Sequence, residues 1–390
     1  MAALQLGHQL ELLQGGQDFF PALIEAIDSS VQEVRIETYI FNTLHSSALV
    51  AEALERAAAR GVAVYLVMDG VGTPTLEPQW CRRFERAGVA WHIFAPMGRL
   101  GLLIPSRWRR LHRKLCVVDG RLAFCGGINL LDDFFDPNHG LLSLPRLDFV
   151  VRVRGPLVQE AQTLLTQFWW RLPMLRPAQT APRPRVQAMP QPAALARPAG
   201  ARAALVLRDN LLHRTRIERA YRRAIGEANQ DVIIANAYFL PGRKLRQSLI
   251  HAAQRGVRVR LLLQGRYEYF MQYHAARPVY GPLLAAGIEI YEYSPSFLHA
   301  KVAVVDQCWA TVGSSNLDPL SLLLAREANL VTTDPVFALD LRCRLEQAIE
   351  QGGVAVDPAS YADRPWRQGL LDRLAFGLMR LALFLTGKRY

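Results

Sequence analysis

The segment His112-Arg113-Lys114-Leu115-Cys116-Val117-Val118-Asp119 is repeated 187 residues later as His299-Ala300-Lys301-Val302-Ala303-Val304-Val305-Asp306. In each copy a glycine follows 14 residues after the histidine (Gly126, Gly313) and an asparagine 17 residues after it (Asn129, Asn316). A lone His-x-Lys is usually accidental, but here histidine, lysine, aspartate, glycine and asparagine recur in register. The matched pair predicts one phosphate site at a two-fold interface.

The apolar runs 115–118 and 302–305 are rich in valine, which predicts buried strands. Alternate residues of a strand share a face, so His112 and Lys114 should point the same way, as should His299 and Lys301. An imidazole and an ammonium group on one rigid face can converge on an anion. We therefore expect these four residues to be catalytic.

Small and amide residues follow each strand and supply neutral hydrogen-bond donors. Glycine and serine let backbone N–H groups approach phosphate oxygens. The residues expected to bind phosphate are Gly127, Asn129, Ser314, Ser315 and Asn316. No metal ion is expected, because the cationic side chains supply the compensating charge. Asp119 and Asp306 complete the expected catalytic set, with the alternative that each only secures a turn or a neighbouring cation at its strand end.

Other segments recur around the two motifs. EVRIETYIF at 33–41 corresponds to DVIIANAYFL at 231–240, and AAARGVAVYLV at 57–67 corresponds to AAQRGVRVRLLL at 252–263. Each half therefore reads as alternating helices and strands around its motif strand, which predicts α/β layers with a mixed sheet. A repeat of this length suits two fused homologous domains.

The paired HxKxxxxD motif, with GGIN after the first copy and GSSN after the second, resembles the phospholipase D superfamily. The stretch HAKVAVVDQCWATVGSSNLDPLSL, which begins at His299, resembles the bacterial cardiolipin synthases, most closely the B-type branch. The resemblance runs from about Leu10 to about Ile349. It implies two homologous phospholipase D-like α/β/α domains with mixed sheets, packed as a pseudo-two-fold pair.

The resemblance also implies residue roles. His112 would attack phosphorus to form a covalent phosphohistidine, and His299 would be the general acid and base; the sequence alone leaves the reverse open. Glu327 matches the orienting carboxylate of the superfamily, and Asp148 is its counterpart in the first half, displaced by an eight-residue insertion. Each could instead form a simple surface ion pair. The resemblance implies no cofactor.

Four regions are expected along the chain: a first domain at 1–171, a proline-rich linker at 172–203, a second domain at 204–355 and an amphipathic tail at 356–390. The first half also carries about twelve extra residues upstream of His112, within MGRLGLLIPSRWRR at 97–110. Their mixture of arginine and apolar residues predicts a flap that dips into lipid or covers the site, rather than a packed surface loop.

Charge and the tail predict the partner. The net charge of +12 favours an anionic surface, either nucleic acid or an acidic membrane. The apolar face of 366–390 is interrupted by Arg380 and is shorter than the roughly 20 residues that a membrane span needs. We expect this helix to lie on an anionic phospholipid membrane containing phosphatidylglycerol, and no nucleic-acid partner; packing on the protein's own core is the alternative.

Five cysteines (Cys81, Cys116, Cys125, Cys308, Cys343) form no CxxC pair, and three of them fall in expected core strands (Cys116, Cys125, Cys308). This pattern predicts reduced thiols. No Lys or Arg precedes Arg35, so we expect no secretory signal. The expected location is the cytoplasmic face of the cell membrane, peripherally bound.

The molecule that accepts the phosphatidyl group determines whether the enzyme is a transferase or a hydrolase. The resemblance implies transfer of a phosphatidyl group from phosphatidylglycerol or another phospholipid to phosphatidylglycerol, giving cardiolipin. The alternatives are a hydrolase or nuclease of the same superfamily, and an inactive lipid-binding scaffold. The apolar flap and tail favour the transferase, and the completeness of both motifs argues against the scaffold.

Overall fold

The computed structural model of the chain describes residues 3–98, 104–172, 200–209, 213–267, 270–318, 325–362 and 366–385. The first half contains β1 (Gln5–Gln14), α1 (Gly15–Asp28), β2 (Glu33–Thr38), α2 (Ser46–Ala59), β3 (Ala63–Asp69), α3 (Pro78–Ala87), β4 (Ala90–Phe94), η2 (Pro105–Trp108), β5 (Arg110–Leu111), β6 (Lys114–Val118), β7 (Leu122–Gly126), β8 (Phe135–Asp136), β9 (Gly140–Leu141), β10 (Phe149–Arg154) and α4 (Leu157–Trp169). The order confirms the alternation of helices and strands that the sequence predicts, and it adds a strand at the start of the half.

The second half repeats this order. It contains β11 (Ala201–Arg208), α5 (Arg216–Glu227), β12 (Asp231–Asn236), α6 (Arg243–Gln254), β13 (Arg258–Gln264), α7 (Phe270–Ala285), β14 (Glu289–Tyr293), β15 (Lys301–Val305), β16 (Trp309–Gly313), β17 (Ala325–Thr332), α9 (Pro335–Gly352), β18 (Gly353–Ala355), α10 (Pro358–Ala362) and α11 (Trp366–Leu385). Strand β11 begins three residues before the expected start at 204. Most of the expected linker, 173–199, lies outside the described residues. The division into four regions stays a prediction.

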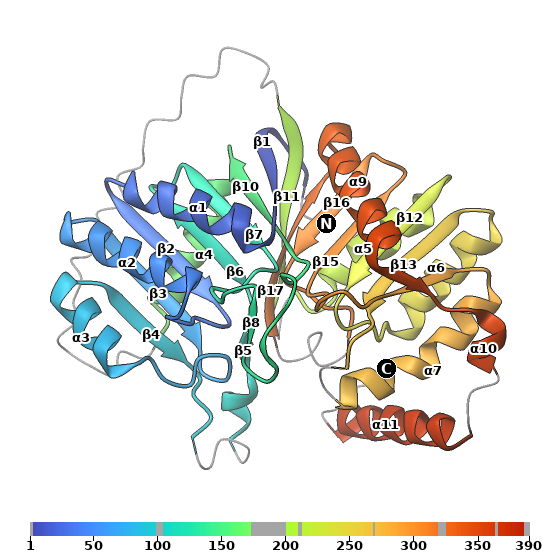
Figure 1. Cartoon of the computed structure of the whole chain (residues 1–390). Coiled ribbons are helices and arrows are strands. Elements are labelled where there is room, and N and C mark those ends of the chain that lie inside the picture. The colour runs from blue at the N-terminus through green and yellow to red at the C-terminus, as the bar shows by residue number, and fades with distance from the viewer. Residues whose placement is uncertain are drawn as a thin grey trace.

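The sheet is mixed, as predicted. Strands β2, β3 and β4 pair in parallel, as do β12, β13 and β14, whereas each motif strand pairs antiparallel with both of its neighbours. The two half-sheets join through antiparallel pairing of β1 with β11, at Gln5↔Ala203 and His8↔Ala201. The expected pair of domains therefore shares one continuous sheet (Figure 1).

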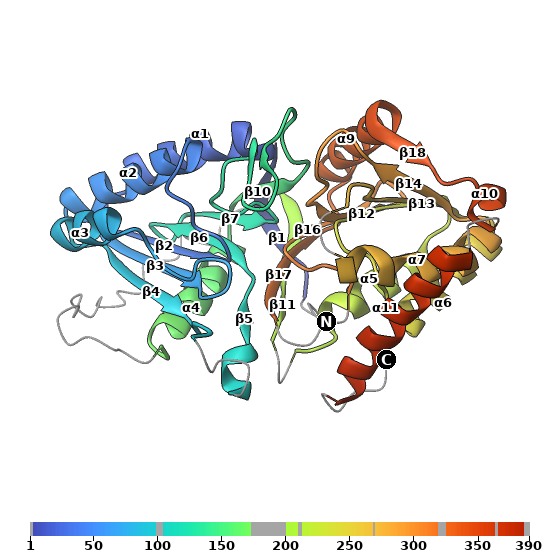
Figure 2. The same cartoon turned by 60° about the horizontal axis from the view of Figure 1, so that its bottom comes forward.

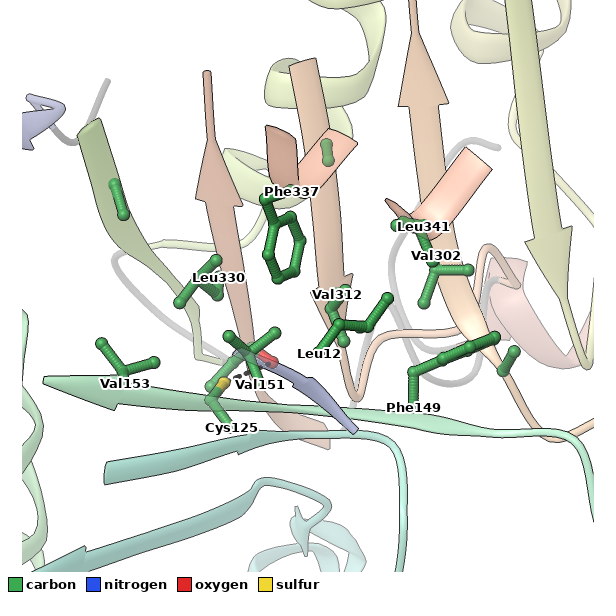
Figure 3. Close-up of a cluster of buried hydrophobic side chains, with 14 of the residues drawn as sticks. Leu12, Cys125, Phe149, Val151, Val153, Val302, Val312, Leu330, Phe337 and Leu341 are labelled. Atoms are coloured by element: carbon green, nitrogen blue, oxygen red, sulfur yellow. Dashed lines mark hydrogen bonds between the residues drawn. The ribbon is translucent and has the colours of Figure 1, made fainter. Parts of the chain in front are cut away.

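Helices cover the sheet in layers. Helices α1, α2 and α3 flank the first half, and α5, α6 and α7 flank the second half (Figure 2). A hydrophobic core built from both halves lies where the halves meet and includes residues of α4 and α9. Figure 3 shows side chains from both halves packed into it, including Phe149 of β10 and Phe337 of α9. This shared apolar core fixes the two halves against each other.

The motif strands β6 and β15 are buried along their whole length, as the valine-rich sequence predicts. Just before β6, residues 110–111 form the short strand β5, which pairs in parallel with Ala325–Arg326 of the other half. In the second half, Leu298 forms the matching bridge to Leu147. The segments that lead into both motifs are thus held by the opposite half.

The tail packs on the protein and also presents an apolar face. Helix α11 lies beside α7 (Figures 1 and 2), where Asp372 is buried and bonds His274 at 2.7 Å. Ala375 is buried in the core of the second half. The exposed side is rich in leucine, at Leu370, Leu371, Leu374 and Leu378. No described helix has the length and apolar character needed to cross a membrane.

The cysteines and the expected flap at 97–110 are the two remaining features. Cys308 is exposed in the turn between β15 and β16, so its expected place in a core strand is wrong: the strand ends at Val305 because the chain must reverse there. All five cysteines are free. Of the expected flap, residues 99–103 lie outside the described residues; in the described remainder, Arg110 is held by Asp69 at 3.0 Å.

Candidate functional site

Both motif histidines line one cavity of about 610 Å³ between the halves. Positive charge on His112 lowers the pKa of His299, as expected for two neighbouring groups. Residues of both halves complete the wall: Tyr39, Ile40, Val71, Gly72, Arg110, Ile128, Asn129, Leu131, Asp133, Asp136, Pro137, Asn138, Arg146, Asp148, Tyr238, Asn316, Asp318 and Ala325. The structure thus brings the two motifs to one place, as the pairing predicts.

Each histidine is held by a carboxylate from the opposite half. His112 Nδ1 lies 3.0 Å from Glu327 Oε1, and His299 Nδ1 lies 2.6 Å from Asp148 Oδ2. These contacts occupy Nδ1 of each ring, so Nε2 is the nitrogen left for a ligand in the cavity. Glu327 and Asp148 are buried, which excludes the alternative that they form surface ion pairs.

Backbone pairing explains why the histidines and carboxylates meet. His112 N–H donates to Arg326 C=O at 3.0 Å, and Arg326 directly precedes Glu327. His299 N–H donates to Leu147 C=O at 2.9 Å, and Leu147 directly precedes Asp148. The same cross-half bond therefore sets both pairs, which makes the site pseudo-two-fold.

The two carboxylates differ in their surroundings. Burial acts to raise the pKa of Glu327, but the charge and hydrogen bond of His112, with Lys114 and the Ser314 hydroxyl, outweigh it and lower that pKa. The hydroxyl of Ser314 donates to Glu327 Oε2 at 2.5 Å. Glu327 is therefore ionised near neutral pH, beside His112.

Among the residues that the structure describes, no hydroxyl group donates to Asp148 as Ser314 does to Glu327. The residue of the first half that corresponds to Ser314 is Gly127, where a Cβ atom would lie only 2.2 Å from the Asp148 carboxyl group. Burial raises the pKa of Asp148 to about 7, although Lys301 opposes the rise. Burial also lowers the pKa of His299 well below its usual value, and Lys301 and Lys114 lower it further. The Asp148–His299 pair thus titrates near neutrality through its carboxyl group.

The lysines lie behind the histidines. Lys114 Nζ donates to His112 C=O at 3.0 Å, and Lys301 Nζ donates to His299 C=O and lies 4.0 Å from Asp148. Burial lowers the pKa of Lys114 to about 7, and the charge of Lys301 contributes to that decrease. Two buried lysines beside the histidines favour the arrival of an anion in the cavity.

Only part of the expected phosphate-binding set reaches the cavity wall. Asn129 and Asn316 line the cavity, and Asn129 is fixed because its Oδ1 accepts from Ile40 N–H at 3.2 Å. Ser314 instead supports Glu327, and Ser315 Oγ contacts the C=O of Asn316 at 3.4 Å. Direct binding of phosphate by the expected residues stays a prediction.

Asp119 and Asp306 do not reach the cavity, which corrects their place in the expected catalytic set. The Asp119 carboxylate accepts three backbone N–H groups, from Val31, Gln32 and Glu33, at 2.8–2.9 Å. The Asp306 carboxylate does the same for Asn229, Gln230 and Asp231, at 2.7–3.0 Å. Each lies five residues beyond its lysine, about 16 Å along an extended strand. Both aspartates therefore secure turns, the alternative noted for them.

Two arginines of the cavity were missed as site residues. Arg110 precedes His112 by two residues, and Arg146 precedes Asp148 by two. Strand alternation would have placed each on the same side as its site residue, so the signal was present. Among the described residues, no group of three or more His, Cys, Asp and Glu side chains could hold a metal ion.

Comparisons with known proteins agree with this geometry. The family described as cardiolipin synthase, PLD-like domain, matches residues 23–166 and 221–349. The chain is 38% identical to cardiolipin synthase B of Salmonella typhi over 374 residues, covering 96% of this chain and 88% of the relative. It is 36% identical to cardiolipin synthase B of Escherichia coli K12 over the same shares of the two chains.

Solved structures show the same fold at low identity. The phosphatidylserine synthase of Haemophilus influenzae Rd KW20 superimposes with a TM-score of 0.70 at 14% identity, over 98% of this chain and 96% of that one. The polyphosphate kinase of Porphyromonas gingivalis gives a TM-score of 0.58 at 14% identity, over 95% of this chain and 53% of that one. Both likenesses support the α/β architecture with two repeated halves.

Proposed function

Because the chain belongs to the cardiolipin synthases of the phospholipase D superfamily, we propose that it transfers a phosphatidyl group to phosphatidylglycerol through a covalent phosphohistidine. The observation that carries the proposal is that each motif histidine contacts a carboxylate of the opposite half at one cavity: His112 contacts Glu327, and His299 contacts Asp148. Two imidazoles that present Nε2 to one cavity can act on opposite sides of one phosphorus atom.

In the first step, His112 Nε2 attacks phosphorus. A P–N bond forms, the P–O bond to the departing alcohol breaks, and His299 gives its proton to that alcohol. The ionised Glu327 accepts from His112 Nδ1–H and makes Nε2 a stronger nucleophile. Burial lowers the pKa of His112, which keeps the ring neutral, as a nucleophile must be.

In the second step, His299 removes the proton from a hydroxyl group of phosphatidylglycerol. The resulting oxygen attacks phosphorus and the P–N bond breaks, which returns neutral His112. The raised pKa of Asp148 supports this role for His299, because the pair can take up and release a proton near pH 7. An entering phosphodiester would also raise the pKa of His299, by offsetting the positive charge of Lys114 and Lys301.

Acid–base catalysis supplies roughly 10²–10⁴-fold acceleration, a small part of what phosphodiester cleavage requires. Stabilisation of charge on the five-coordinate phosphorus is therefore expected to contribute more. The groups proposed for it are Lys114 and Lys301, with Asn129 and Asn316 at the cavity wall. The donor is phosphatidylglycerol or another phospholipid, which leaves glycerol or another alcohol as the first product.

The proposed location is the cytoplasmic face of the cell membrane. The exposed leucines of α11 lie near exposed Arg367 and Arg373, a combination that suits an anionic lipid surface. Each Lys or Arg held near such a surface contributes about 1 kcal/mol. The five free cysteines suit a reducing compartment.

Incubating the purified protein with phosphatidylglycerol vesicles and, separately, with supercoiled plasmid tests the proposal. Cardiolipin should accumulate while the plasmid stays intact. Phosphatidic acid without cardiolipin would show a hydrolase, nicked plasmid a nuclease, and absence of any product a binding scaffold. The His112→Ala variant controls for contaminating enzymes and should form no product.

A further inference from the structure

A hairpin found in the first half has no equivalent of the same length in the second. Between Asn129 and Asp148 the chain is eight residues longer than between Asn316 and Glu327. Within this segment β8 pairs antiparallel with β9, so residues 131–146 form a hairpin. Its end is anchored, because Leu147 bridges to Leu298 immediately before His299. The hairpin therefore stands directly beside the catalytic cavity.

The inner side of the hairpin is polar and rigid. Asp133, Asp136, Asn138 and Arg146 line the cavity. Arg146 donates to Asp132 C=O at 2.9 Å, to Phe135 C=O at 2.5 Å and to Asp136 Oδ2 at 2.8 Å. Three bonds from one guanidinium group hold the two arms together, so the outer side is presented in a fixed position.

The outer side is apolar and open to solvent. Phe134 is 45% exposed, Leu141 78% and Leu144 48%. Leu44, 45% exposed, belongs to the neighbouring loop, which Ser46 ties to the hairpin through Asp132. Single exposed leucines are common on soluble proteins, but several gathered at the mouth of a substrate cavity indicate an interaction surface.

We propose that the outer side of this hairpin, Phe134, Leu141 and Leu144, inserts into the surface of the lipid bilayer next to the cavity mouth. The inference rests on the proposed function, because it takes a membrane phospholipid as the substrate. A cavity of about 610 Å³ has the size of a site for one small molecule. A two-chain lipid must then leave its acyl chains elsewhere, and the bilayer is where they are most stable.

Charge favours a lipid surface over an apolar protein partner. The chain carries a net charge of +12, and Arg109 is exposed just ahead of Arg110 in the cavity wall. An apolar tip among basic residues matches an anionic bilayer, whose headgroups attract the arginines while its acyl region accepts the leucines. The hairpin would thereby set the cavity at the depth of the phospholipid headgroups.

The test compares Leu141→Asp with the matched control Val336→Asp. Val336 is 79% exposed and lies at the start of α9. Helix α9 follows the end of β17 at Thr332, whereas the site residue Glu327 is near the beginning of that strand. Transfer is measured on vesicles of phosphatidylglycerol with phosphatidylethanolamine, and on short-chain phosphatidylglycerol below its critical micelle concentration. Leu141→Asp should lose at least about tenfold of the activity on vesicles and keep activity on the monomeric lipid. Val336→Asp should keep both.

Equal loss of Leu141→Asp activity on both substrates would overturn the inference, since the hairpin would then act on the chemistry alone. Unchanged activity on vesicles, or an equal loss in Val336→Asp, would overturn it as well. Sedimentation with the same vesicles gives a readout that needs no turnover: Leu141→Asp should bind less than His112→Ala, which should bind like the wild type. Failure of the wild type to form cardiolipin while this difference in binding persists would reject the proposed function and leave the hairpin inference standing.

Discussion

His112 Nδ1 lies 3.0 Å from Glu327 Oε1, although the two residues are 215 positions apart and belong to opposite halves of the chain. The reciprocal contact joins His299 to Asp148 at 2.6 Å. Each motif histidine therefore takes its carboxylate partner from the opposite half. The site exists only when both halves are folded and packed together.

Replacing Glu327 by glutamine tests the role of its charge. The side-chain shape is retained, but the anion that accepts a hydrogen bond from His112 Nδ1–H, and so fixes the tautomer with Nε2 free, is lost. Turnover should fall on the order of 10²- to 10⁴-fold while the melting temperature changes little. A variant with near-normal turnover would show that Glu327 only fills space.

The hydroxyl of Ser314 should matter more than that of Ser315. Ser314 Oγ donates to Glu327 Oε2 at 2.5 Å, whereas Ser315 Oγ donates to the C=O of Asn316 at 3.4 Å. Removing the first hydroxyl raises the pKa of Glu327, so Ser314→Ala should move the acid limb of the kcat/KM profile to higher pH. Ser315→Ala is the matched control and should leave that limb in place. Equal shifts in both variants would contradict the assignment.

Asp148 should make stability depend on pH. Burial raises its pKa from 3.8 to about 7, so the folded state binds a proton that the unfolded state has released between these values. Its contribution to stability is present below pH 4 and is lost as the pH rises through about 7. Asp148→Asn cannot ionise, so its melting temperature relative to wild type should rise between pH 5 and pH 8. A constant difference across this range would exclude the raised pKa.

Asp119→Ala should destabilise the protein without altering its chemistry. Three backbone N–H groups lose a charged acceptor, which should lower the free energy of unfolding by about 2 kcal/mol. Denaturant unfolding measures the loss, and turnover per folded molecule should match the wild type. Reduced turnover at unchanged stability would return Asp119 to the catalytic set.

The exposed and buried faces of α11 should respond differently to charge. Leu374 is 57% exposed and Ala375 is 2% exposed, although they are neighbours in the sequence. Leu374→Asp should weaken sedimentation with anionic vesicles at an unchanged melting temperature. Ala375→Asp should lower the melting temperature, because it buries a carboxylate against the core of the second half. Normal vesicle binding by Leu374→Asp would make the helix purely structural.

Local patterns in the sequence carried much of the site. Strand alternation placed His112 beside Lys114 and His299 beside Lys301, and the repeat predicted that both motifs reach one cavity. The same alternation could have added Arg110 and Arg146. The local pattern also gave one wrong prediction, that Cys308 lies in a core strand. Cys308 follows a valine-rich strand, but it lies in the turn after that strand and is exposed.

The pairing between halves could not be predicted in this way. Each histidine could equally have met the carboxylate of its own half, since both carboxylates lie downstream of a motif at similar distances. The choice depends on backbone bonds that join His112 to Arg326 and His299 to Leu147, which form only after the halves dock. The joining of two half-sheets through β1 and β11 is likewise a tertiary property.

During the proposed transfer, the phosphorus atom is bonded covalently to His112, and His299 lies on the other side of that phosphorus atom. Rapid acid-free quenching of the wild-type protein after mixing with phosphate-labelled phosphatidylglycerol, followed by peptide mapping, measures this directly. The account predicts a phosphatidyl group on the peptide containing residue 112, and none in His112→Ala. Label on the peptide containing residue 299, or no covalent label on the wild-type protein, would contradict it.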